Sequence, residues 1–148
     1  MIYIGADHRG FQLKETLKKF LEDEGYKFID VGNDHFDEND DYPDFALAVA
    51  KKVVDQPEAG HGILICGSGV GVDIVANKIK NVRSALCFDV KQAQASRNDD
   101  NTNILSLPAD FISEDSAKEI TKIWLETSFS GFERHARRIE KINKIEII

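Results

Sequence analysis

The feature that most constrains the fold of this chain is an apolar run that breaks into three alternate glycines and then resumes as a helical pattern. This stretch, residues 62–78, reads GILICGSGVGVDIVANK. The apolar run suits a strand buried on both faces of a parallel sheet, and the apolar spacing after the glycines indicates a helix. A strand, a glycine turn and a helix in this order direct backbone N–H groups at one spot, where they can hold an anion or a developing oxyanion. We therefore expect a functional site in this turn.

Two side chains that can do chemistry belong to the turn. Cys66 ends the expected strand, and Ser68 stands between Gly67 and Gly69. A helix N-terminus stabilises a thiolate, so a cysteine there can act as a base or a nucleophile. Tight packing alone is the simpler alternative, because a buried cysteine is usually just a small hydrophobic residue. The spacing lacks the third glycine of a dinucleotide fingerprint and the Gly-Lys-Ser/Thr of a P-loop, which disfavours nucleotide binding.

Length, charge and cysteine usage narrow the class of protein. We expect one domain, residues 1–148, which is long enough to bury a core. The net charge of −7 disfavours nucleic acids and anionic membranes as the main partners. No apolar run reaches the length of a membrane span, and no signal peptide is recognisable. Cys66 and Cys87 form neither a CxxC pair nor a metal-type spacing, so we expect free thiols in a cytoplasmic protein.

Along the rest of the chain, strand-like runs alternate with helical patterns. Strands are expected at residues 1–6, 26–31, 63–66, 83–87 and 103–107. Helices are expected from residue 11 to a stop at Gly25, at 44–55, from about 72, at 89–98, from 113, and in the basic segment 134–144. This alternation predicts a doubly wound α/β fold with a five-stranded parallel sheet and an extra C-terminal helix. The terminal helix carries isoleucines at positions 139, 142 and 145, which must be buried against its own domain or a partner subunit.

Ligands of such sheets bind at the carboxyl ends of the strands. Asp7 and His8 follow the first expected strand, Cys66 ends the third and Asp89 follows the fourth, so these residues should share one edge. Asp7 and His8 could hold a sugar hydroxyl or act as an acid–base pair, or Asp7 could simply cap the next helix beside an exposed histidine. The histidines of expected loops are interpreted as surface residues; they are His35 and His61.

Basic and acidic pairs later in the chain have two interpretations each. Arg134 and Arg138 lie four residues apart, hence on one helical face, and guanidinium groups bind phosphate oxygens bidentately. Taken alone, they are better explained as a solvated helix end. Asp99 and Asp100 stand in an expected turn between a helix and a strand, which usually carries no function.

Five segments together resemble one family, in the same order along the chain. They are GADHRG at 5–10, DYPDF at 41–45, the pattern CGSGVGxxIxANK at 66–78, SRxxxxxNIL at 96–105 and RHARR at 134–138. Through them the chain resembles the sugar-phosphate isomerases that comprise type B ribose-5-phosphate isomerases and galactose-6-phosphate isomerase subunits. The resemblance implies a Rossmann-like three-layer α/β/α domain, a homodimer or tetramer with shared active sites, and neither metal nor cofactor.

The same resemblance implies the interconversion of ribose 5-phosphate and ribulose 5-phosphate through a cis-enediolate. Cys66 resembles the base that moves a proton between C1 and C2, and Ser68 with the amides of 67–71 resembles the groups that hold the enediolate oxygen. Arg134 and Arg138 resemble phosphate ligands that serve a neighbouring subunit's site. Asp99 takes the place of the residue that opens the sugar ring. The substrate-binding residues implied in this way are Asp7, His8, Tyr42, Gly67, Gly69, Gly71, Asp100, Arg134 and Arg138.

The chain departs from the family pattern mainly at three acidic positions. Asp99 and Asp100 replace a common His-Asn pair, and Asp110 replaces an arginine after the fifth strand. A carboxylate could still take the anomeric proton, but acids close to a phosphate repel it. Where some members carry a glutamate base, this chain has Val72 with Asp73 beside it, so Cys66 is the preferred base. The alternatives are an isomerase of another sugar phosphate, one of a free sugar, or a non-catalytic sugar-phosphate-binding subunit.

Overall fold

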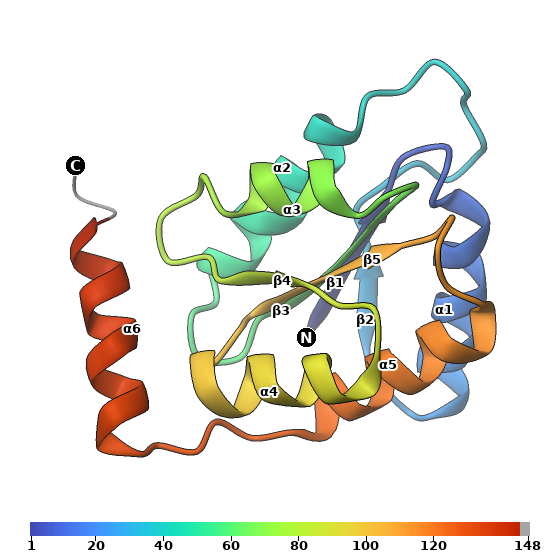
Figure 1. Cartoon of the computed structure of the whole chain (residues 1–148). Coiled ribbons are helices and arrows are strands. Elements are labelled where there is room, and N and C mark those ends of the chain that lie inside the picture. The colour runs from blue at the N-terminus through green and yellow to red at the C-terminus, as the bar shows by residue number, and fades with distance from the viewer. Residues whose placement is uncertain (146–148) are drawn as a thin grey trace.

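The computed structural model describes residues 1–145, whose backbone forms one five-stranded parallel sheet with helices on both faces (Figure 1). The strands are β1 (Ile2–Ala6), β2 (Phe28–Asp30), β3 (His61–Cys66), β4 (Ser84–Leu86) and β5 (Ile104–Pro108). The helices are α1 (Phe11–Asp23), α2 (Tyr42–Val54), α3 (Val70–Ala76), α4 (Val90–Asp100), α5 (Glu114–Glu126) and α6 (Glu133–Ile145). The predicted three-layer α/β/α fold with an extra C-terminal helix is confirmed.

The strand order β2-β1-β3-β5-β4 puts β1 and β3 side by side in the middle of the sheet. After β1 the chain passes outward to the edge strand β2, and after β3 it passes to the opposite edge strand β4 and returns with β5 between β3 and β4. The carboxyl ends of β1 and β3 therefore flank the topological switch point, where open α/β sheets bind their ligands. Because Ala6 pairs with Ile65, Asp7, the first residue after β1, lies at the level of Cys66, the last residue of β3.

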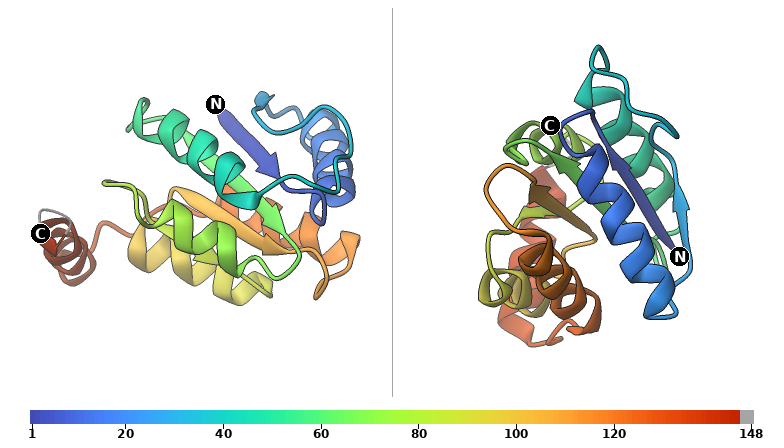
Figure 2. Two further views of the ribbon diagram at one scale, coloured as in Figure 1. Left: turned by 90° about the horizontal axis from the view of Figure 1, so that it is seen from above. Right: turned by 90° about the vertical axis from the view of Figure 1, so that its right-hand side faces the viewer.

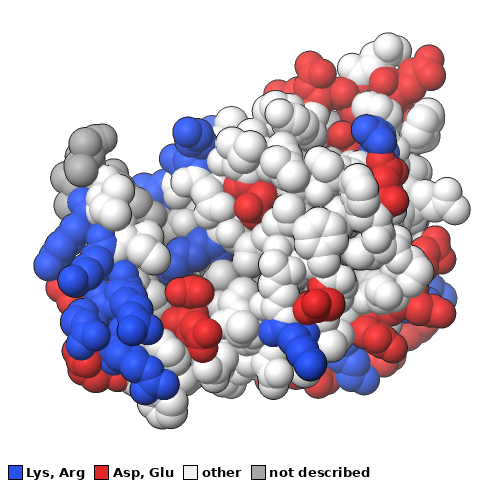
Figure 3. All heavy atoms as spheres, viewed as in Figure 1, with Lys and Arg blue, Asp and Glu red and all other residues white. Residues whose placement is uncertain are grey.

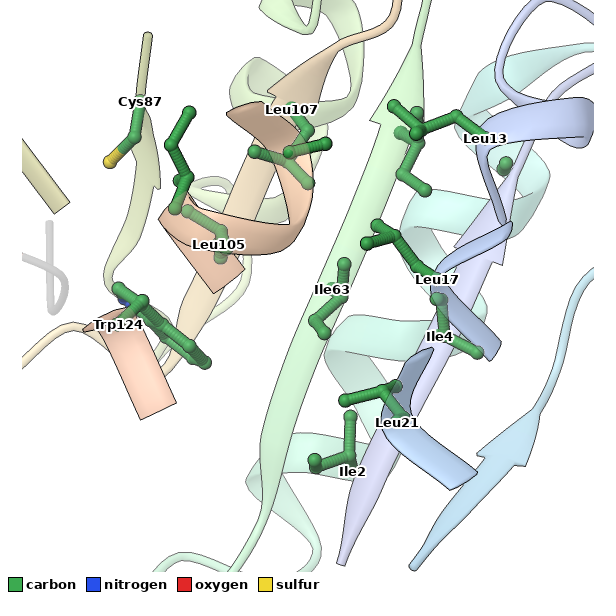
Figure 4. Packing of buried hydrophobic residues seen from close by; sticks show 14 of the residues in the cluster. Ile2, Ile4, Leu13, Leu17, Leu21, Ile63, Cys87, Leu105, Leu107 and Trp124 are labelled. Carbon is green, nitrogen blue, oxygen red and sulfur yellow. The ribbon is translucent and has the colours of Figure 1, made fainter. Parts of the chain in front are cut away.

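Two hydrophobic cores hold the helices to the sheet. Helices α1, α4 and α5 cover one face, and α2 and α3 cover the other (Figure 2). In the first core, Ile2, Ile4 and Ile63 of the central strands pack with Leu17 and Leu21 of α1 (Figure 4). Neighbouring residues of the same strands point into the second core, so both faces of the central strands are apolar. This is the burial that the apolar run of β3 predicts.

Two local predictions were wrong. His61 is the first residue of β3 rather than a loop residue, because β3 starts two residues before the Ile63–Ile65 run and His61 pairs with Ile2. Its ring packs edge-on against Trp124 at 5.5 Å between ring centroids, and burial lowers the pKa of His61 to about 4. Asp99 and Asp100 are the last residues of α4 instead of a turn, since the helix ends only at the left-handed Asn101 (φ 47°).

Helix α6 stands apart from the sheet at the end of an extended connection (Figure 1). It packs against α4, and of its described residues only His135 is buried. Ile142 and Ile145 of the apolar stripe are 39% and 65% exposed and line a groove of about 430 Å³ that reaches β4. The stripe is therefore incompletely covered by the described part of its own chain. None of the helices in residues 1–145 is long and apolar enough to cross a membrane.

Candidate active site at the carboxyl edge of the sheet

A cavity of about 340 Å³ opens at the switch point between β1 and β3. Residues from the β1–α1 loop, the start of α2 and the β3–α3 turn line it, and six of them are candidate site residues from the sequence. The lining residues are Asp7, Arg9, Tyr42, Cys66, Gly67, Ser68, Val70, Gly71 and Ile74. The structure thus brings together segments that lie far apart in the chain.

Cys66 receives a hydrogen bond from the turn that follows it. The Gly69 N–H donates to Cys66 Sγ at 3.2 Å, and Val70 N–H donates to Ser68 Oγ at 3.2 Å. Gly69 has a left-handed backbone (φ 73°), and a Cβ there would lie 2.5 Å from the Leu86 side chain. Glycine is therefore required for the turn that points this N–H at the sulfur. The Ser68 side chain is exposed at the mouth of the cavity.

Tyr42 forms one wall of the cavity from the first residue of α2. A Cβ at Gly71 would lie 2.5 Å from the Tyr42 ring, so the absence of a side chain at Gly71 lets the ring approach the first turn of α3. The sequence pattern placed Gly71 in a turn, whereas α3 already begins at Val70. In this position Gly71 makes room for a neighbouring side chain.

Asp7 both orders the loop that precedes α1 and lines the Cys66 cavity. Its Oδ1 accepts hydrogen bonds from the Arg9 and Gly10 N–H groups at 3.0 and 3.1 Å, which fixes the turn between β1 and the N-cap residue of α1, Gly10. The carboxylate also lines the Cys66 cavity. Burial raises the pKa of Asp7 above its ordinary value, and these two hydrogen bonds and the charge of His8 offset the rise only in part. Only Oδ1 of Asp7 takes part in these two structural bonds.

His8 lies beside this cavity, in an adjoining hollow of about 380 Å³ that Arg9 also lines. Its Nδ1 is 2.8 Å from the Asp40 carboxylate, and this hydrogen bond raises the pKa of His8 above its ordinary value. Asp40 is held in turn by Asn33 Nδ2 at 2.9 Å, and the Asn33 carbonyl accepts from the fully buried Lys14. The acidic loop between β2 and α2, residues 33–41, is thus anchored so that it orients His8.

Three ligand atoms of Asp7, His8 and Asp40 lie within 4.8 Å of one another, a spacing that a metal ion could bridge. However, the Asp7 oxygen already accepts two N–H groups, and His8 Nδ1 is bonded to Asp40. Hydrogen bonding therefore explains this cluster without a metal.

The carboxylate of Asp73 points away from the cavity. Ser84 Oγ donates to Asp73 Oδ1 at 2.6 Å, and burial raises the pKa of Asp73 although the bonds from Ser84 and Ser106 oppose the rise. Asp73 does not line the cavity that contains Cys66. This arrangement supports the choice of Cys66 over its acidic neighbour as the candidate base.

A second group of candidate residues lies toward the amino ends of the strands, opposite the carboxyl edge that carries Cys66. Asp99 and Asp100 end α4, which leads into the first residues of β5, and Arg134 and Arg138 lie on the neighbouring α6. His135 connects the two helices, with its Nε2 3.7 Å from the Asp99 carboxylate. Figure 3 shows the basic side chains gathered over α6, away from the red acidic loop. Within residues 1–145 of one copy, this group does not meet Cys66.

Comparison with known proteins identifies the family. A family model described as ribose/galactose isomerase matches residues 2–142. The chain belongs to the ribose/galactose isomerase family. It is 43% identical to a probable ribose-5-phosphate isomerase B of Mycoplasma genitalium, over 98% of this chain and 95% of that protein. It is also 39% identical to a D-erythrulose-4-phosphate isomerase of Pectobacterium atrosepticum, over 98% of this chain and 94% of that protein.

The fold of the family is equally clear in solved structures. The crystal structure of the Mycoplasma genitalium ribose-5-phosphate isomerase B with bound ribulose-5-phosphate matches with a TM-score of 0.95 at 42% identity, over 99% of this chain and 95% of that one. The predicted family and the class of aldose–ketose isomerase are therefore confirmed. Relatives named for different sugar phosphates have similar identity, so membership alone does not choose between those substrates.

Sequence reasoning missed one residue of the candidate site in this member of the ribose/galactose isomerase family. Arg9 lines the Cys66 cavity and forms an ion pair with Asp110, 101 positions further along the chain. The available signal was a cation in the same strand-end loop as Asp7 and His8. Its partner could not be read from local sequence, because the pair forms only when the ends of β1 and β5 come to the same edge.

Proposed function

We propose that this chain interconverts ribose 5-phosphate and ribulose 5-phosphate. The observation that carries the proposal is the full-length likeness to a ribose-5-phosphate isomerase B whose crystal structure contains ribulose-5-phosphate. The Cys66 cavity adds chemical support, because it combines a thiol with a glycine turn that presents backbone N–H groups.

Cys66 serves as the base in this proposal. As a thiolate, its sulfur removes the proton on C2 of the open-chain aldose, and the electrons of that C–H bond form the C1–C2 double bond. The carbonyl electrons move onto O1, which gives a cis-enediolate. The thiol then returns its proton to C1, while a hydroxyl proton passes from O2 to O1, and the ketose results. Ser68 and the amides of 67–71 hold the enediolate oxygen, where preorganised donors lower the barrier most.

The remaining binding groups come from a second copy of the chain. The exposed apolar residues Val70 and Ile74 at the rim of the cavity, and the half-covered stripe of α6, are surfaces that a second copy can bury. Such a pairing brings Arg134 and Arg138 to the phosphate of a substrate bound near the partner's Cys66. Asp99 opens the sugar ring there, and Asp100 contacts the substrate.

Isomerisation of another sugar phosphate is the alternative that a specific observation favours. The relative named D-erythrulose-4-phosphate isomerase is nearly as similar as the ribose-5-phosphate isomerases, and this chain carries Asp99, Asp100 and Asp110 at positions where the family pattern has other residues. Acidic side chains at these positions change the hydrogen bonds that the pocket offers to sugar hydroxyls, and they lower its affinity for negatively charged groups.

A coupled aldose–ketose assay on the purified chain tests the proposed substrate. We expect kcat/KM for ribose 5-phosphate to exceed that for D-erythrulose 4-phosphate, galactose 6-phosphate and free ribose by about tenfold or more, because a pocket built for one polar ligand rejects its analogues. A preference for one of the other sugars would show that the acidic positions redefine the substrate. The lack of turnover on every sugar would favour a non-catalytic subunit.

The Asp40→Asn variant tests the role of His8 through pH. Because the bond to Asp40 raises the pKa of His8, the imidazole stays cationic to a higher pH than an ordinary histidine and loses its charge as the pH rises through that pKa. KM for ribose 5-phosphate should therefore stay low below the raised pKa and increase above it. Asp40→Asn removes the cause, so the increase should start at a lower pH.

The matched control for this measurement is Asp34→Asn. Asp34 is 2.7 Å from His35 Nδ1 and raises the pKa of that histidine, but both residues lie outside the Cys66 cavity and the hollow of His8. KM should be recorded from about pH 6 to pH 9, the range in which histidine titrates. If Asp40→Asn and Asp34→Asn both leave the wild-type profile unchanged, His8 does not bind the substrate as a cation.

A further inference from the structure

Arg9 is the one cation among the described residues that line the Cys66 cavity. The other charged lining residue is Asp7, which would repel an anion. Within this cavity a sugar phosphate therefore meets one positive side chain from the same chain as Cys66, and the His8 imidazole lies in the adjoining hollow. The proposed function places arginines of a second copy at the phosphate and gives Arg9 no role.

The Arg9 side chain lies where three hollows meet. Besides the Cys66 cavity, it lines the hollow that contains His8 and another of about 260 Å³ that reaches Gln12 and Ile112. A Cβ at Gly67 would lie 2.6 Å from Arg9 Nε and 2.7 Å from Asp110 Oδ2. The Arg9–Asp110 ion pair thus lies directly against the residue that follows Cys66, and the missing side chain of Gly67 makes room for it.

The two partners of this pair are held differently. Asp110 is fixed through its backbone, because its N–H donates to the Gly67 carbonyl at 2.9 Å. The Arg9 side chain is 61% exposed, and among the described residues its guanidinium forms a hydrogen bond or ion pair only with the Asp110 carboxylate. Exposed ion pairs of this kind contribute little to stability, so the guanidinium can change partner at small cost.

A phosphate group is a stronger partner for Arg9 than Asp110 is. A phosphate monoester carries a charge of about −1.5 to −2 near neutral pH and offers three acceptor oxygens, whereas a carboxylate carries a single charge. Guanidinium binds phosphate bidentately, which adds geometric fit to the larger charge. The exchange requires only a rotation of the long arginine side chain at the mouth of the cavity.

We propose that Arg9 leaves Asp110 and binds the phosphate of the substrate, and that Asp110 acts as an internal competitor that sets the affinity. This inference rests on the proposed function, since it concerns the phosphate end of the same substrate. It makes Arg9 a binding residue supplied by the chain that also supplies Cys66. The pair then favours phosphorylated sugars over free sugars, because a neutral sugar cannot displace the carboxylate from Arg9.

Steady-state kinetics of Arg9→Gln, Asp110→Asn and the double variant test this inference. Arg9→Gln should raise KM for ribose 5-phosphate by about tenfold, the size expected for one lost charge-assisted hydrogen bond, and leave kcat nearly unchanged. Asp110→Asn should lower KM several-fold because the competitor is gone. In the double variant KM should equal that of Arg9→Gln, since Asp110 acts only through Arg9. Lys19→Gln, which removes an exposed ion pair with Asp23 on α1, is the matched control and should change nothing.

Titration with inorganic phosphate separates this inference from the proposed function. If the wild type does not turn over ribose 5-phosphate, the proposed function fails, but calorimetry can still show whether phosphate binds more weakly to Arg9→Gln and more tightly to Asp110→Asn. Equal phosphate affinity in all three proteins would overturn the role of Arg9. So would an unchanged KM of Arg9→Gln, or an Asp110→Asn effect that persists in the double variant.

Discussion

Replacing Cys66 with alanine is expected to abolish isomerisation while sugar-phosphate binding survives. The sulfur is the proton carrier in the proposed mechanism, and a positioned general base contributes about 10²–10⁴-fold to such reactions, so kcat should fall by about 10³-fold or more. The alanine side chain fits the space of the buried cysteine, and the Gly69 turn keeps its backbone. The dissociation constant for ribose 5-phosphate, measured by calorimetry, should therefore stay within a few-fold of the wild type.

Cys87→Ala is the matched control for this variant. Cys87 is also buried, but it follows β4 outside the cavity, and burial raises the pKa of its thiol to about 12, so it cannot act as a base near neutral pH. Its removal should leave kcat close to that of the wild type. A Cys66→Ala variant with full kcat would rule out the proton-transfer role, and loss of folding would be seen as a changed melting temperature.

The fold could be predicted because each strand and helix has a strong local signal. The apolar run at Ile63–Ile65 and the glycines after it specify β3 and the turn, and parallel packing follows from the alternation of elements. The carboxyl-edge rule then placed Asp7 beside Cys66, as the structure shows. These inferences need only neighbours in sequence and the general geometry of a doubly wound sheet.

The features that could not be predicted depend on packing between distant segments. His61 is polar and precedes the apolar run, yet the register with Ile2 draws it into β3, and Trp124 covers its ring. The Arg9–Asp110 pair needs the loops after β1 and β5 to meet. The position of α6 also depends on a long connection, and no local pattern shows that its arginines lie at the opposite edge from Cys66 in one copy.

That separation of α6 from Cys66 leads to the second prediction with a large effect. If each site combines Cys66 of one copy with Arg134 and Arg138 of another, two inactive variants should restore activity when they are mixed. One variant is Cys66→Ala, and the other is the double change Arg134→Ala and Arg138→Ala. The latter removes two charge-assisted contacts to the phosphate and should lower kcat/KM by about 10³-fold.

The mixture gives a quantitative expectation for a symmetric dimer. Random pairing of equal amounts makes half of the dimers mixed, and each mixed dimer has one complete site of two, so activity should recover to about one quarter of the wild-type value. The mixed dimers can be formed by co-expression or by joint unfolding and refolding, and each variant treated alone in the same way must stay inactive. A site contained in one copy would give no recovery, because neither chain holds both the thiol and the arginines. Full activity of the double arginine variant would instead remove α6 from the site and leave Arg9 as the cation that faces the phosphate.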